Sequence, residues 1–133
     1  AVKLAKSKHI KKIQILRDKI INEVKKNISD VKLNGSKKNR ICNNVNFTFY
    51  GIEGEAIGGY LDLKGIATST GSACSSHTLE SSHVLTAIGL NKKDANSSLR
   101  VTLSRFNTEK EIDKFLKILL KIVKKLRRFS PYV

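Results

Sequence analysis

The sequence predicts an α+β domain in which two long amphipathic helices cover a short sheet of about three strands. Two segments, one near each end, carry apolar residues at steps of three and four, and short runs between them alternate and are rich in β-formers. The 133 residues are 40% hydrophobic and 28% charged, which is typical of one globular domain spanning 1–133 and excludes wholesale disorder.

The first long helix is expected over residues 8–28. Its apolar positions are Ile10, Ile13, Leu16, Ile20, Ile21, Val24 and Ile28. Asn34-Gly35 and the polar run to Arg40 then turn the chain. Residues 44–50 alternate in polarity and are expected to form a strand that Gly51 ends.

The middle of the chain is predicted to hold short elements. We expect a helix over 54–64, a strand over 66–68, an accessible loop over 69–78, and a helix over 80–88 that Gly89 closes. The loop residues are small and show no periodicity, which indicates an exposed connection.

The C-terminal part is predicted as a strand over 99–103 followed by the second long helix. Thr108 and Glu111 form a capping box at the start of this helix, which is expected to run to about Arg128. Its apolar stripe consists of Ile112, Phe115, Leu116, Leu119, Ile122, Val123 and Leu126.

The net charge of +15 is confined to the two ends of the chain. Residues 1–40 carry 13 Lys and Arg against 3 acids, residues 41–106 carry 5 of each, and residues 107–133 carry 8 against 3. Specific nucleic-acid binding proteins favour Arg and interleave aromatic residues, whereas 20 of the 26 basic residues here are Lys. We therefore interpret the charge as solvated helix faces and expect no specific nucleic-acid partner, with a Lys-rich nucleic-acid module as the alternative.

Targeting signals are not apparent in the sequence. No apolar run approaches the roughly 20 residues of a membrane helix, and no signal peptide is visible, so we expect no membrane partner. Two cysteines 32 positions apart do not make a disulfide framework, which favours a reducing, cytoplasmic setting. The sequence contains no Met, which suggests a processed, trimmed or fragmentary chain.

Cys74 is the candidate nucleophile. It lies among Gly, Ser, Ala and Thr in the predicted loop, where a thiolate can be exposed and near the N–H groups of the following helix. Three alternatives remain: a small buried cysteine, a zinc site made by Cys74, His77 and His83, and a Cys–His hydrolase. The zinc spacing lacks a clear fourth ligand, because Cys42 is the only other cysteine.

Arg100 is the candidate binding residue. It alternates out of phase with Leu99 and Val101, so its guanidinium points to the opposite face of the predicted strand. A guanidinium there suits bidentate binding of a carboxylate, and the alternative is a solvated or ion-paired arginine.

Several motifs in order resemble the C-terminal part of the NifS/IscS-type cysteine desulfurases of the class V aminotransferase family. The segment 67–76 (Ala-Thr-Ser-Thr-Gly-Ser-Ala-Cys-Ser-Ser) resembles the catalytic-cysteine loop of that family. The likeness continues through 79–90, 97–106 and the final helix to Ser130-Pro131. It implies the small C-terminal domain of a fold-type I pyridoxal phosphate enzyme, with the large cofactor-binding domain absent from this chain.

The resemblance also implies a reaction and partners. These enzymes convert L-cysteine to L-alanine and hold the sulfur as a persulfide on the loop cysteine, here Cys74, while Arg100 matches the residue that binds the substrate carboxylate. The expected partners are an iron–sulfur scaffold or a tRNA-thiolation relay protein, the missing large domain, and a second copy in a homodimer. The cofactor-binding Ser-x-His-Lys motif does not occur in this sequence, so the Schiff-base lysine is expected outside this chain.

Two departures from the family pattern bear on these expectations. The family usually has Pro where Cys42 and Ser81 stand, which makes Cys42 a possible second thiol of undefined role. Without the cofactor domain, we expect no cofactor binding and no activity from the isolated chain. The alternative is a stand-alone persulfide carrier or interaction module without catalysis.

Overall fold

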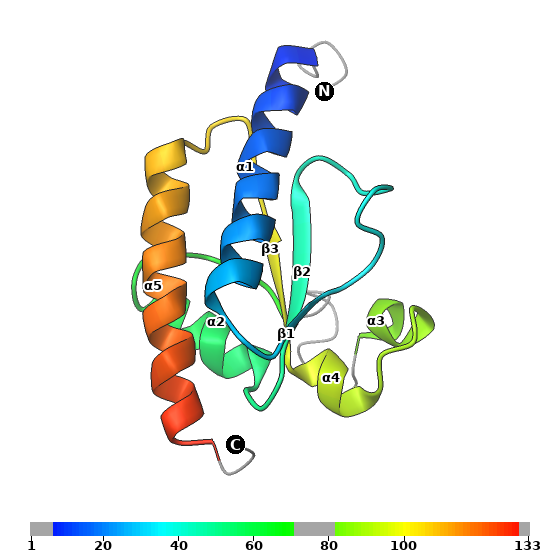
Figure 1. Cartoon of the computed structure of the whole chain (residues 1–133), viewed down its shortest axis with the longest axis vertical. Coiled ribbons are helices and arrows are strands. Elements are labelled where there is room, and N and C mark those ends of the chain that lie inside the picture. The colour runs from blue at the N-terminus through cyan, green and yellow to red at the C-terminus, as the bar shows by residue number, and fades with distance from the viewer. Residues whose placement is uncertain (1–6, 71–81, 131–133) are drawn as a thin grey trace.

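The computed structural model describes residues 7–70 and 82–130, which form helices packed on a small sheet (Figure 1). In chain order the elements are α1 (Ser7–Asn27), β1 (Val31–Leu33), β2 (Asn44–Phe49), α2 (Gly54–Asp62), α3 (His83–Ala87), α4 (Lys92–Asn96), β3 (Ser98–Thr102) and α5 (Glu109–Arg128). The mixture of helices and a three-stranded antiparallel sheet confirms the predicted α+β class.

The sheet has the order β1-β2-β3, and both pairings are antiparallel. In β2 and β3 the residues alternate between two faces, because successive side chains of a strand point to opposite sides. One face is apolar and carries Val45, Phe47, Phe49, Leu99 and Val101. The other face is polar: its cross-strand pairs are Asn44 with Thr102, Asn46 with Arg100, and Thr48 with Ser98.

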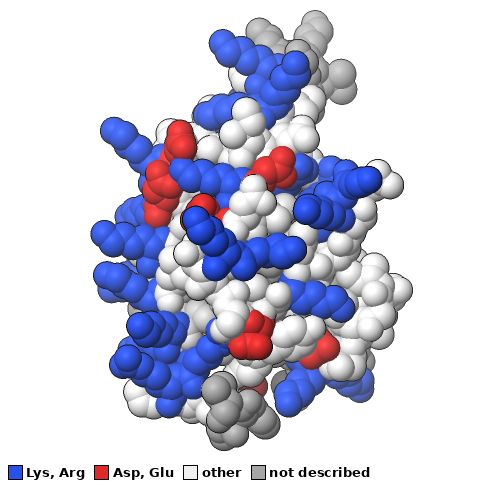
Figure 2. All heavy atoms as spheres, in the orientation of Figure 1, with Lys and Arg blue, Asp and Glu red and all other residues white. Residues whose placement is uncertain are grey.

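The main core lies between the apolar face of the sheet and helices α1, α2 and α5. The stripes of α1 and α5 that the sequence predicts are buried in it, from Ile13 to Ile28 and from Ile112 to Val123, whereas Ile10 is 41% exposed. The capping box at Thr108 is present, with Glu111 bonded to the Thr108 backbone. The basic side chains lie mainly over the outer surfaces of these helices (Figure 2), which agrees with solvated helix faces.

The structure contradicts one predicted strand and contains two elements that were not predicted. Residues 66–68 form no strand: only Ser69 makes an isolated bridge, to Arg100, and the third strand is instead Val31–Leu33. Residues 92–96, for which no element was predicted, form α4, which Asn91 caps by accepting a hydrogen bond from the Asp94 backbone at 2.8 Å. Gly89 has φ +91 and follows α3, as expected for a residue that closes a helix.

A second, small cluster packs α3 against α4. It consists of Leu85, Leu90 and Ala95, and it lies apart from the main core. Among residues 7–70 and 82–130, no helix has the length and apolar character needed to cross a bilayer.

Candidate functional site

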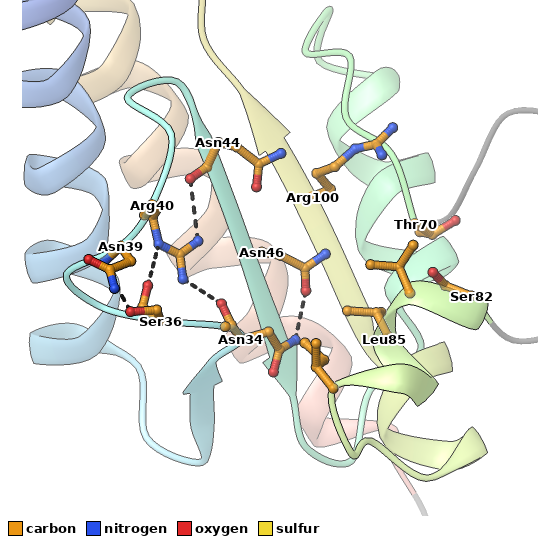
Figure 3. A pocket seen from close by; sticks show the side chains of 13 residues that line it. Asn34, Ser36, Asn39, Arg40, Asn44, Asn46, Thr70, Ser82, Leu85 and Arg100 are labelled. Atoms are coloured by element: carbon orange, nitrogen blue, oxygen red, sulfur yellow. Dashed lines mark hydrogen bonds between the residues drawn. The ribbon is translucent and has the colours of Figure 1, made fainter.

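A cavity of about 360 Å³ opens over the polar face of the sheet. Residues between Asn34 and Asn46 line one side, and Arg100 of β3 also lines the cavity. Val84 and Leu85 of α3, with Ile88 directly after this helix, contribute apolar side chains. Thr70 and Ser82 also line it, and they are the two described residues that flank residues 71–81. Figure 3 shows these groups arranged around the cavity.

Arg100 is half-buried on the polar face of β3, on the side opposite Leu99 and Val101. Its backbone exchanges two hydrogen bonds with Ser69, at 2.6 and 3.1 Å, and its Nη2 donates to Ser69 Oγ at 3.2 Å. Among the described residues no Asp or Glu forms an ion pair with its guanidinium. The predicted orientation is confirmed, and much of the donor capacity of the guanidinium remains on the cavity side.

Asn34 organises a buried polar network beside the cavity. It is 3% exposed, and its Nδ2 lies 2.7 Å from Asn46 Oδ1 and 2.9 Å from Thr48 Oγ1. The Thr48 and Ser98 hydroxyls lie 2.9 Å apart, and Ser98 Oγ donates to the Asp94 carbonyl of α4 at 2.8 Å. The end of the polar face next to α4 is therefore fully hydrogen-bonded, as buried polar groups require.

Arg40 holds the loop that forms one wall of the cavity. Its guanidinium donates to the carbonyl oxygens of Asn34, Ser36 and Asn44 (Figure 3). Arg17 of α1 in turn donates to the Ile41 carbonyl at 2.9 Å, so the loop is tied to the helix behind it. Burial, and secondarily the neighbouring Arg17 charge, lower the pKa of Arg40 from its usual value.

The electrostatic character of the cavity favours an anion. Two arginines and several amide and hydroxyl groups line it, and no Asp or Glu is among its described lining residues. A small carboxylate, which accepts hydrogen bonds only, matches a guanidinium and neighbouring N–H groups.

Of the other predicted site residues, two lie outside the part of the chain that the structure describes and two lie within it. Cys74 and His77 lie outside the described residues. His83 is exposed at the start of α3, and Cys42 is a free, half-buried thiol packed against the main core. Among residues 7–70 and 82–130 no three His, Cys, Asp or Glu side chains are grouped as metal ligands would be.

Sequence reasoning missed Asn34, Arg40 and Asn46 as residues of the site. Asn34 and Arg40 were interpreted only as parts of a turn, and Asn46 only as part of a strand. The alternation of residues 44–48 could have placed Asn46 on the polar face, but its pairing with Arg100 depends on a register that joins residues 54 positions apart.

Comparisons with known proteins give the family of the chain. A family model described as aminotransferase class-V matches residues 1–115. The cysteine desulfurase IscS of Dictyoglomus turgidum is 49% identical over 129 residues, which cover 97% of this chain and 33% of that protein. Cysteine desulfurase IscS 1 of Archaeoglobus fulgidus is 48% identical over 120 residues, covering 90% of this chain and 31% of the relative.

A solved structure agrees with these sequence matches. The NifS-like protein of Rickettsia africae superposes with a TM-score of 0.77 at 28% identity, over 89% of this chain and 30% of that one. The chain thus spans about a third of the length of the relatives it matches. The resemblance predicted from the sequence is confirmed: the chain belongs to the aminotransferase class-V family.

Proposed function

We propose that this chain is the small C-terminal domain of a cysteine desulfurase, and that it supplies the carboxylate-binding and sulfur-accepting groups of the active site. In this proposal Arg100 binds the carboxylate of L-cysteine and Cys74 receives the sulfur. The whole enzyme converts L-cysteine to L-alanine for an iron–sulfur scaffold or a tRNA-thiolation relay, as a cytoplasmic homodimer.

One observation carries the proposal: the two ends of the segment that contains Cys74 lie at the cavity that Arg100 lines. Thr70 and Ser82 both line it, and Ser69 is bonded through its backbone to Arg100. The described residues on either side of 71–81 therefore both line the cavity that Arg100 lines. This position of Thr70 and Ser82 supports the assignment of Cys74 as the group that receives sulfur from a substrate held by its carboxylate at Arg100.

The family implies pyridoxal phosphate, which binds as a Schiff base to a lysine amine and labilises bonds of the bound amino acid. No lysine is among the described residues that line the cavity, whereas the guanidinium and amide groups there suit a carboxylate. We therefore assign the Schiff-base lysine to the rest of the enzyme. The role of this chain is to bind and orient the substrate and to accept its sulfur.

The sulfur-accepting step uses the Cys74 thiolate as the nucleophile. It attacks the sulfur of the bound cysteine, so that an S–S bond forms and the C–S bond of the substrate breaks. The electron pair of that bond stays on the substrate carbon, which takes up a proton and becomes the methyl group of alanine. The products are L-alanine and a persulfide on Cys74, which balances the atoms of one L-cysteine and one thiol.

A chimeric enzyme tests the proposal. The matching third of the Dictyoglomus turgidum relative is replaced by this chain, and L-alanine formed from L-cysteine is measured by chromatography. We expect activity from the chimera, none from the isolated chain, and none from Cys74→Ser. A folded, cofactor-loaded chimera that makes alanine equally well with Cys74→Ser contradicts the assignment of the thiol.

Matched variants separate the two roles. Arg100→Lys keeps the charge but loses the planar fork, so KM for L-cysteine should rise about tenfold or more with a smaller change in kcat. Cys42→Ser is the control for Cys74→Ser, because Cys42 packs against the core away from the cavity lining, and it should leave turnover unchanged. A KM unaffected by Arg100→Lys excludes the proposed carboxylate contact.

A further inference from the structure

The carboxamide of Asn46 lies beside Arg100 on the polar face of the sheet. The two residues are Cα partners in the β2–β3 register, so their side chains leave the same face as direct neighbours. Asn46 is half-buried, and both residues line the cavity. A small ligand that reaches the guanidinium therefore also meets this carboxamide.

Asn34 fixes the direction in which the Asn46 amide points. Asn34 Nδ2 donates to Asn46 Oδ1 at 2.7 Å, so the oxygen of the Asn46 amide faces Asn34 and its nitrogen faces away. Figure 3 shows this nitrogen turned from Asn34 toward the side of the cavity lined by Thr70. Among residues 7–70 and 82–130, no acceptor bonds the Asn46 Nδ2 group.

Asn34 itself is held in place from several sides. Its backbone N–H donates to the Asn46 carbonyl at 2.9 Å, and its own carbonyl accepts from Arg40. Its Oδ1 accepts from Thr48 Oγ1 at 3.3 Å. At 3% exposure this side chain cannot turn over without leaving buried polar atoms unpaired, so the orientation it imposes on Asn46 is rigid.

We infer that Asn46 Nδ2 is a second donor to the carboxylate bound at Arg100, and that Asn34 is the positioning residue that aims it. The inference rests on the proposed function, because it takes the carboxylate of L-cysteine as the ligand. It adds specificity: a carboxylate offers only acceptors to both side chains, whereas an amide or ester of cysteine lacks the charge that Arg100 requires. The site thus selects the free amino acid over a cysteine whose carboxyl group is blocked.

Side-chain NMR signals of the ¹⁵N-labelled chain test the inference directly. The chain is titrated under reducing conditions with L-cysteine and, in parallel, with L-cysteine methyl ester. We expect the Nδ2 signals of Asn46 and the Nε signal of Arg100 to shift together with L-cysteine and to stay in place with the ester. A shift of Arg100 without Asn46 overturns this inference and leaves the proposed function standing. No shift of either signal overturns both.

Variants give an independent measure. Asn46→Ala should weaken L-cysteine binding about tenfold, the loss expected for one hydrogen bond to a charged group. Asn46→Asp should abolish it, because the new carboxylate occupies Arg100. The control is Thr102→Ala, an exposed residue of β3 on the same face that does not line the cavity, and this variant should bind as the unchanged chain does.

The role of Asn34 needs its own readout. In Asn34→Ala the two Nδ2 hydrogen signals of Asn46 should move to the positions typical of an unconstrained asparagine amide, because no hydrogen bond then fixes the side-chain torsion, while the Arg100 signal still responds to L-cysteine. Since Asn34 is buried, this variant can lose stability, and backbone spectra report whether it is folded. Asn46→Ala at its half-buried position decides the inference independently. Unchanged binding in that variant refutes it.

Discussion

The contact between helix α2 and strand β3 makes a sharp prediction about two glycines of one helix. Gly54 is the first residue of α2 and lies against the backbone of β3. A Cβ added to Gly54 would lie 2.1 Å from the Ser98 carbonyl oxygen and 2.9 Å from its carbon, whereas a Cβ at Gly59 would meet no atom within 4 Å. Neither glycine has a positive φ, so the change to Ala introduces no backbone strain at either position.

The two substitutions should have opposite signs. In Gly54→Ala the obstructing atoms belong to backbone, so the helix and strand must separate, and we expect the free energy of unfolding to fall by about 2 kcal/mol. In Gly59→Ala the better helix propensity of Ala should raise it by about 0.5–1 kcal/mol. For a chain of this length 1 kcal/mol corresponds to about 3.5 °C in Tm, so Gly54→Ala should melt about 7 °C lower than the unchanged chain.

Urea unfolding followed by far-UV circular dichroism measures both effects. An unchanged m-value would show that the same surface is exposed on unfolding, so that the midpoint reports stability. Gly58→Ala is a useful intermediate, because its Cβ would make an ordinary contact of 3.6 Å with Thr68 Oγ1. Equal stabilities for Gly54→Ala and Gly59→Ala would refute the close approach of α2 to β3.

Three further predictions concern the contacts that hold the helices. Arg17→Met should cost about 2–4 kcal/mol in urea unfolding, because the buried guanidinium bonds backbone carbonyls of the cavity loop; an unchanged midpoint argues against that anchor. Thr108 holds the pKa of Glu111 below its usual range through backbone and side-chain hydrogen bonds. The stability that this carboxylate adds is therefore present at neutral pH and is lost as the pH falls through the lowered pKa. The Tm values of Glu111→Gln and of the unchanged chain should therefore converge in acid. A difference in Tm that stays constant with pH contradicts this prediction. Lys19→Met should lower Tm at low salt but not in about 1 M salt, because Lys19 bridges two exposed carboxylates of α5; a salt-independent loss would point to packing instead.

The long helices could be predicted because their signal is local. Each helix shows its apolar residues at every third or fourth position within one continuous segment, and the Thr108–Glu111 capping box spans only four residues. The structure confirms both features. The third strand could not be found in this way. Val31–Leu33 has only three residues and is defined by its pairing with β2, whereas residues 66–68 have β-formers but no ladder to join.

The same distinction between local and long-range signals holds for the residues of the candidate site. The orientation of Arg100 follows from alternation along one strand, so the sequence predicted it. Asn34 looked like a turn former, and Gly35 at φ +75 confirms that turn. Its buried side chain also meets Ser98 at 3.3 Å, across 64 positions, and no local pattern records such a contact.

The polar face of the sheet is closed by hydrogen bonds at one end and opens into the cavity at the other. A small domain can in this way present a candidate binding site while its core stays packed. At one end Thr48 and Ser98 are closed by the Asp94 carbonyl of α4, so no polar atom there needs water or a ligand. At the other end Asn46 and Arg100 open into the cavity. Asn34 lies between the two ends and bonds to both, so the rigidity of the closed end is transmitted to the open one. In the proposed function, a carboxylate at Arg100 therefore meets an Asn46 amide that is already oriented, which lowers the ordering cost that the protein contributes to binding.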